Sequence, residues 1–162
     1  MDTDRILENS AHAFAVVACT IQRDGFGLES HSLVMASTVN AGLALELYAK
    51  CLRQLAVGDY PKSHNLKNIL KKLPGAMQSE LQKAFDESVT DERKEEIRQV
   101  ETQSGLKVDT DFHSVVANWS RVFVEGRYWF ETAPTSSKPP LHWFFFEELV
   151  RVLRAAIDKQ RS

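Results

Sequence analysis

Residues 40–74 read NAGLALELYAKCLRQLAVGDYPKSHNLKNILKKLP, and this stretch decides the fold. Its first part is apolar nearly all round, which is typical of a helix at the centre of a bundle. Gly58 is suited to end that helix, and Pro61 cannot continue it. A short helix is then expected to stop before Pro74, with apolar positions at Leu66, Ile69, Leu70 and Leu73. The stretch therefore predicts a helix–turn–helix corner.

The helical pattern continues on both sides of this corner. Apolar spacing predicts helices over residues 3–22, 29–57 and 141–159. A further amphipathic helix is expected to start after N-caps at 109–111 and to reach Phe130. The first helix should bury one face, formed by Leu7, Phe14, Val17, Ala18 and Ile21. No stretch alternates with period two for long enough to form a strand, so we expect an all-α, up-and-down bundle of about five to six helices.

The length of 162 residues fits one domain, so we expect residues 1–162 to fold as a single unit. Residues 86–108 are polar with few apolar positions, which indicates a helical arm that could be mobile. Residues 133–140, APTSSKPP, are a loop by composition, because prolines and serines oppose regular structure.

The charge balance limits the classes of function. A net charge of −2 provides no overall positive field, so any nucleic-acid binding must come from a local patch. Cys19 and Cys51 are typical of small buried residues in a reducing compartment. The polar start lacks the features of a secretory signal, and no apolar run is long enough to cross a membrane. We therefore expect a cytoplasmic protein without a membrane partner.

Glu46 and Lys50 are the first candidate binding residues. They lie four apart with the acid nearer the N-terminus, an arrangement that stabilises a helix by about 0.3–0.5 kcal/mol. Their leucine-rich surroundings predict partial burial, where charges need partners. The pair could therefore be a structural ion pair or part of a site.

His64 opens the short helix of the corner, with Lys67 and other lysines close in sequence. A phosphate could dock where these cations converge. In the structural alternative, His64 only caps the helix and the lysines form a solvated face.

Arg127 and Glu131 form a second polar cluster, where Tyr128 offers a flat surface beside the guanidinium. This cluster could bind a ligand, or it could bridge to the central helix.

No sequence pattern indicates a metal or a cofactor. There is no paired-cysteine zinc pattern, no HExxH, no glycine-rich phosphate loop and no nucleophile elbow. The five histidines have no metal-ligand spacing, so we expect no metal site and no bound cofactor.

Three segments resemble signature segments of the HEPN (higher eukaryote and prokaryote nucleotide-binding) domains, namely NAGLALELYAKCLRQL, HNLKNILKKLP and FVEGRYWFE. The resemblance covers about half of the chain and implies a dimeric helical bundle. Such bundles serve as RNA-cutting toxins, as defence factors, or as RNA- or nucleotide-binding accessories. The residues at matching positions are Glu46, Lys50, His64, Asn65, Arg127, Tyr128 and Glu131.

The chain departs from the catalytic members of that family. The catalytic members share an Arg and a His that are separated by four to six residues late in the bundle. In this chain the first histidine after Arg127 is His142. Arg5 and His12 have six residues between them, but they lie in the first helix. The resemblance therefore implies an RNA- or nucleotide-binding accessory or defence module without robust catalysis.

Two alternatives remain open. The first is a metal-independent endoribonuclease toxin with a site formed at a dimer interface, using Arg127 or Arg5 for phosphate and His64 or His12 for proton transfer. The second is a ligand-free interaction module, because four adjacent aromatic residues at 143–146 cannot all be buried on one side of a helix. Expected partners are a second copy of the chain, RNA or a nucleotide, and a protein such as an antitoxin or a nucleotidyltransferase.

Overall fold

The structure is a computed structural model that describes residues 2–24, 31–105, 107–120, 122 and 144–162. Regular structure within these ranges is all helical, as the sequence predicts, and they contain no strand. The helices are α1 (Thr3–Asp24), α2 (His31–Val57), α3 (Leu66–Leu70), α4 (Gly75–Ser88), α5 (Asp91–Ser104), a helical segment at 112–120, and α7 (Phe146–Arg161).

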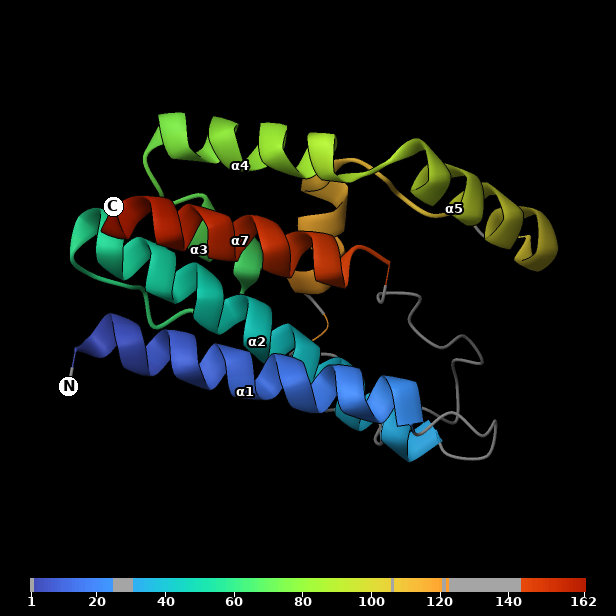
Figure 1. The fold of residues 1–162 in the computed structure, drawn as a ribbon, viewed down its shortest axis with the longest axis horizontal. Helices are drawn as coiled ribbons and strands as arrows, with labels where there is room; N and C mark the ends of the chain where they lie inside the picture. Colours follow the sequence, from blue (N-terminus) through green and yellow to red (C-terminus); the bar gives the residue numbers. More distant parts are fainter. Residues whose placement is uncertain (1, 25–30, 106, 121, 123–143) are drawn as a thin grey trace.

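The long helices lie side by side in a bundle (Figure 1). Helix α1 packs along α2, α7 packs on α2, and α4 covers α7 from the other side. Helix α5 continues from α4 and extends beyond the end of the bundle, and the two chain termini lie at the opposite end. The central position of α2 agrees with its apolar sequence.

The polar segment at 86–108 consists of the end of α4, a short connection and α5. Thr90 caps α5, because its hydroxyl accepts a hydrogen bond from the backbone N–H of Arg93. Gly105 ends the helix with φ 68°, a left-handed conformation that favours glycine. Local capping therefore explains a helix that buries only Ile97. The predicted loop at 133–140 lies outside the described residues.

The start of the last helix was predicted wrongly. Residues 144–145 form a turn, and α7 begins at Phe146 rather than at 141. The cause is Phe145, whose φ of 71° takes it out of the right-handed helical region. This conformation lets neighbouring rings enter the core in different places, since Phe145 packs near Phe85 and Phe146 packs near Trp119.

Both Phe145 and Phe146 are buried. These two residues therefore do not supply the exposed aromatic surface expected for an interaction module. Phe144 is partly buried, and Trp143 lies outside the described residues.

Arg161, the last residue of α7, connects the C-terminal end of the chain to the start of α1. Arg161 bonds to the carboxylates of Asp4 and Glu8 on α1, with an Arg161 Nη2 to Asp4 Oδ2 distance of 2.8 Å. The Cys51 thiol on α2 donates to the backbone oxygen of Asp4 at 3.2 Å. Bonding to Arg161 lowers the pKa of Asp4 below its ordinary value of 3.8.

We predict that Arg161→Ala flattens the acid limb of the stability curve. A carboxylate with a lowered folded pKa contributes stability above its unfolded pKa and loses it as the pH falls through the folded value. The wild type should therefore lose more stability than Arg161→Ala between about pH 5 and pH 2. Urea unfolding across this range measures the difference, with Lys159→Ala as a control on the same helix. Parallel curves for wild type and Arg161→Ala would contradict the prediction.

Candidate functional site

Glu46 is the centre of the candidate site. Its carboxylate Oε1 lies 2.7 Å from Lys50 Nζ, one helical turn further along α2. The two residues are only 2% and 7% exposed. Because an isolated buried charge is costly, each residue depends on the other for compensation. The prediction that this pair is buried is confirmed.

His64 contacts the same carboxylate from the segment before α3. Its Nδ1 lies 3.1 Å from Glu46 Oε1 and 3.3 Å from Oε2. The imidazole is 60% exposed, whereas the Glu46 side chain is 3% exposed. A neutral imidazole that donates from Nδ1 carries its basic lone pair on Nε2. Glu46 therefore fixes both the orientation and the tautomer of a ring that solvent reaches.

The backbone around the corner explains why His64 reaches α2. Gly58 has φ 83° at the end of α2, which allows the chain to turn. Arg53 then donates to the backbone oxygen of Lys72 and pairs with Asp59 at 2.7 Å. These contacts hold the connection and the end of α3 against α2.

A second set of bonds fixes α3 itself. Asn65 caps the helix, because its Oδ1 accepts from the backbone N–H of Asn68 at 3.0 Å. The Lys67 N–H donates to the hydroxyl of Ser120 at 2.7 Å, which joins α3 to the helical segment at 112–120. The cap of α3 is therefore Asn65, and His64 is one residue before it.

Tyr60 is a site residue that the sequence analysis missed. The centre of the Tyr60 ring lies 6.0 Å from Lys50 Nζ, and the residue is 40% exposed. An aromatic residue in a turn between two helices, here in the sequence DYP, was the available signal. An exposed ring beside a cation can stack on a nucleobase.

The corner is locally basic although the whole chain is not. Residues 46–74 contain six Lys or Arg residues and two acids, a surplus of four positive charges, against −2 for the chain. Both acids are already paired, Glu46 with Lys50 and Asp59 with Arg53. The remaining cations are exposed, namely Lys62, Lys67, Lys71 and Lys72. This surplus favours an anionic ligand.

Of the other predicted site residues, the structure describes two, Arg5 and His12, and neither bonds to this cluster. Arg5 and His12 lie on α1, and both are exposed. Arg127, Tyr128 and Glu131 lie outside the described residues, so their approach to Glu46 stays a prediction. The structure thus brings together Glu46, Lys50 and His64, with Asn65 and Lys67 next to them.

The chemistry available at this corner is hydrogen bonding to an anion and proton transfer at one imidazole. Within the ranges that the structure describes, no group of three or more His, Cys, Asp or Glu side chains is arranged to hold a metal ion. No described helix is long and apolar enough to cross a membrane.

Comparison with protein-family models, with curated proteins and with solved structures gives no significant match. The functional argument therefore rests on the residues of the corner.

Proposed function

We propose that this chain is a HEPN-like module that binds RNA or a nucleotide at the corner between α2 and α3, without robust catalysis of its own. The observation that carries the proposal is the buried Glu46 carboxylate, which holds both Lys50 and the exposed ring of His64. A buried carboxylate is costly and needs bonding partners, and here one of the two partners is an imidazole that solvent, and therefore a ligand, can reach.

Phosphate recognition is supported by the charges at the corner. His64 is fixed by Glu46, and Lys67 is an exposed cation only three residues further along the chain. A phosphate group accepts hydrogen bonds from an ammonium group and from a protonated imidazole, in which both ring nitrogens carry a hydrogen, and it gains from the local positive surplus. Because these contacts are electrostatic, affinity should fall as salt is added.

Base recognition is supported by Tyr60. Its ring is 40% exposed beside Lys50, so one face of a nucleobase can stack on it. Stacking of this kind contributes about 1–3 kcal/mol per base and tolerates different bases. The corner offers both hydrogen-bond donors for a phosphate and an aromatic ring for stacking. This combination fits a nucleotide or a short single-stranded RNA better than inorganic phosphate alone.

Metal-independent RNA cleavage is the second candidate, and the hydrogen bond between Glu46 and His64 favours it. A carboxylate that orients an imidazole is the arrangement of a general base. Cleavage also needs a group that stabilises the phosphate charge. Lys50 is only 7% exposed and is already paired with Glu46, so it is poorly placed for that role. We therefore place binding first.

We predict that His64→Ala and Tyr60→Ala each weaken binding of a fluorescein-labelled single-stranded RNA by about tenfold, from loss of a charged hydrogen bond and of stacking. Fluorescence anisotropy at low salt measures the affinity, with ATP and inorganic phosphate as competitors. Lys83→Ala is the matched control, because Lys83 is an exposed lysine on α4. Equal affinity for all variants, or no binding by the wild type, would refute the proposed site.

The same samples separate binding from cleavage. Incubation of the RNA with wild-type protein and EDTA should leave the RNA intact. Cleavage that His64→Ala abolishes would replace the binding proposal with the endoribonuclease proposal.

The proposed function also includes a homodimer and a partner protein such as an antitoxin or a nucleotidyltransferase. Light scattering on the purified chain tests the dimer.

A further inference from the structure

A groove lies between α1 and α7, with α2 at its floor. Its volume is about 920 Å³, at the upper end of the roughly 300–1,000 Å³ found for small-molecule sites. It shares no lining residue with the corner around Glu46. Tyr48 at the floor lies on α2 between Glu46 and Lys50 in sequence, and side chains two positions apart on a helix point to different faces. Helix α2 thus faces two separate sites.

The walls of the groove are largely apolar. Its lining includes Ala15 and Val16 from α1, and Val150 and Ala155 from α7. Val16 is 50% exposed, so apolar surface in the groove remains open to solvent. A ligand with an apolar body would remove this surface from water.

Tyr48 contributes a buried polar atom to the floor. The residue is fully buried, and its hydroxyl has no hydrogen-bond partner among the described residues. Buried hydroxyls are rarely left without a partner, so this one calls for an explanation. Burial raises the pKa of Tyr48, so the hydroxyl stays protonated at neutral pH and can donate.

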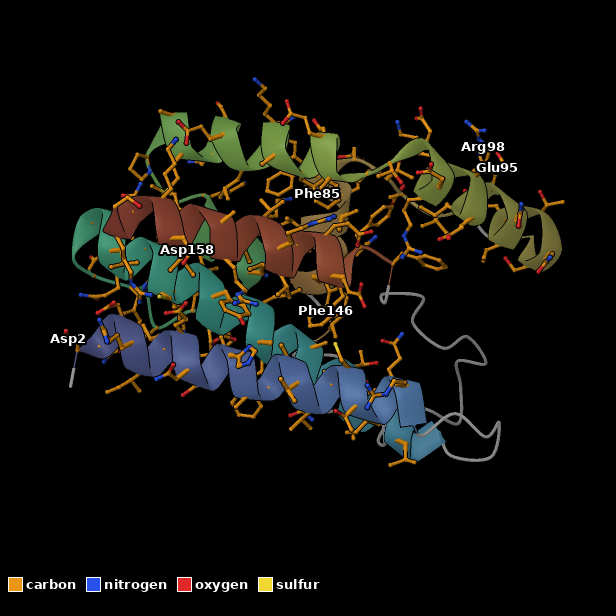
Figure 2. All side chains as sticks on the ribbon, viewed as in Figure 1. Asp2, Phe85, Glu95, Arg98, Phe146 and Asp158 are labelled. Atoms are coloured by element: carbon orange, nitrogen blue, oxygen red, sulfur yellow. The ribbon has the colours of Figure 1, made fainter. Side chains whose placement is uncertain are left out.

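Two further donors line the same groove. Arg154 from α7 lies close enough to Tyr48 to oppose part of that rise in its pKa. Neither Arg154 nor His12 forms an ion pair or a side-chain hydrogen bond within the part of the chain that the structure describes. Asp158, which Figure 2 labels on α7, also lines the groove and follows Arg154 by four residues in the sequence.

The net charge of the lining residues indicates how many negative charges a ligand would carry. Three arginines, Arg23, Arg151 and Arg154, oppose two acids, Glu147 and Asp158, which leaves a surplus of one positive charge when His12 is neutral. A single negative charge matches this surplus better than two.

We propose that the groove between α1 and α7 binds a monocarboxylate with an apolar body, whose carboxylate accepts from Tyr48 and Arg154 while the body lies along Val16 and Val150. The two carboxylate oxygens can accept one bond from each donor. The apolar body then covers the exposed wall.

Sodium decanoate is the probe, and calorimetric titration of the intact chain measures its binding. We expect a dissociation constant on the order of 100 µM for a ligand of this size. Decanol has the body without the charge, and acetate has the charge without the body, so both should bind at least about tenfold more weakly. Decyl phosphate carries more charge and should also bind more weakly. Equal binding of decanol, or tighter binding of decyl phosphate, would overturn the assigned head group.

Variants locate the binding in this groove. Tyr48→Phe removes only a hydroxyl that has no partner in the part of the chain that the structure describes, so the fold should be retained and decanoate affinity should fall about tenfold. Arg154→Gln should give a similar loss, whereas Asp158→Asn should tighten binding by removing a competing charge. Arg98→Gln is the matched control, because Arg98 lies on α5, far from Asp158 in Figure 2. Unchanged affinity in both Tyr48→Phe and Arg154→Gln would overturn the proposal.

The two cysteines give an independent readout. Cys19 lines the groove, whereas Cys51 is fully buried, and burial raises the pKa of its thiol to about 11. Decanoate should therefore slow alkylation of Cys19 by iodoacetamide in the wild type, and about tenfold more decanoate should be needed for the same protection in Arg154→Gln. Equal alkylation rates with and without decanoate, at a concentration that saturates binding in calorimetry, would place the ligand elsewhere and overturn the proposal.

Discussion

Phe85→Ala is expected to lower the free energy of unfolding by about 3–5 kcal/mol. Phe85 is fully buried on α4, and its ring centre lies 5.5 Å from that of Phe112 and 5.6 Å from that of Phe145. Figure 2 shows the side chain directed from α4 toward α7. Three segments that are distant in sequence meet at this ring, so its removal leaves a cavity that no single helix can close.

Urea unfolding followed by circular dichroism measures this loss. Gln82→Ala is the control, because Gln82 is exposed on the same helix and should change stability by no more than about 0.5 kcal/mol. Phe85→Leu should lie between the two, since it retains part of the buried volume. A loss below about 1 kcal/mol for Phe85→Ala would show that α4 does not pack on α7 as described.

The helices of the described residues were largely predictable from sequence, but the packed faces were less so. On α1, Val17 was assigned to the buried face and is 44% exposed, whereas Ala11 and Ala15 are buried. The periodicity argument favoured large side chains. Small residues instead allow α1 to lie close along α2, and that choice depends on the partner helix. The late start of α7 was also missed, because only tertiary packing supports the positive φ of Phe145.

The candidate site was predictable only in part for the same reason. The spacing of Glu46 and Lys50 follows from one helix and was confirmed. The contact of His64 with Glu46 spans 18 residues and depends on the turn after Gly58, so sequence could only place both residues at one corner. Tyr60 became a candidate through its distance to Lys50, which no local pattern encodes.

Lys50→Met is the second change expected to have a large effect, with a loss of about 3–5 kcal/mol in the free energy of unfolding. Methionine retains most of the volume but leaves the Glu46 carboxylate buried without its ammonium partner. The double variant Glu46→Leu/Lys50→Met removes both charges and should recover most of that loss, because apolar replacements of a buried pair are often neutral or stabilising. Urea unfolding measures both, and Lys94→Met, in an exposed pair with Asp91, should change stability by less than about 1 kcal/mol.

The double variant also separates scaffold from site. If the buried pair only locked the bundle, the double variant would regain both stability and RNA binding. Under the proposed function it regains stability but not binding, because His64 loses the carboxylate that orients it. A loss below about 1 kcal/mol in Lys50→Met would instead mean that water or His64 compensates the charge of Glu46. The Glu46 carboxylate would then not depend on Lys50. The stability of the double variant thus tests the packing of α2, while its affinity for RNA tests what the exposed imidazole is for.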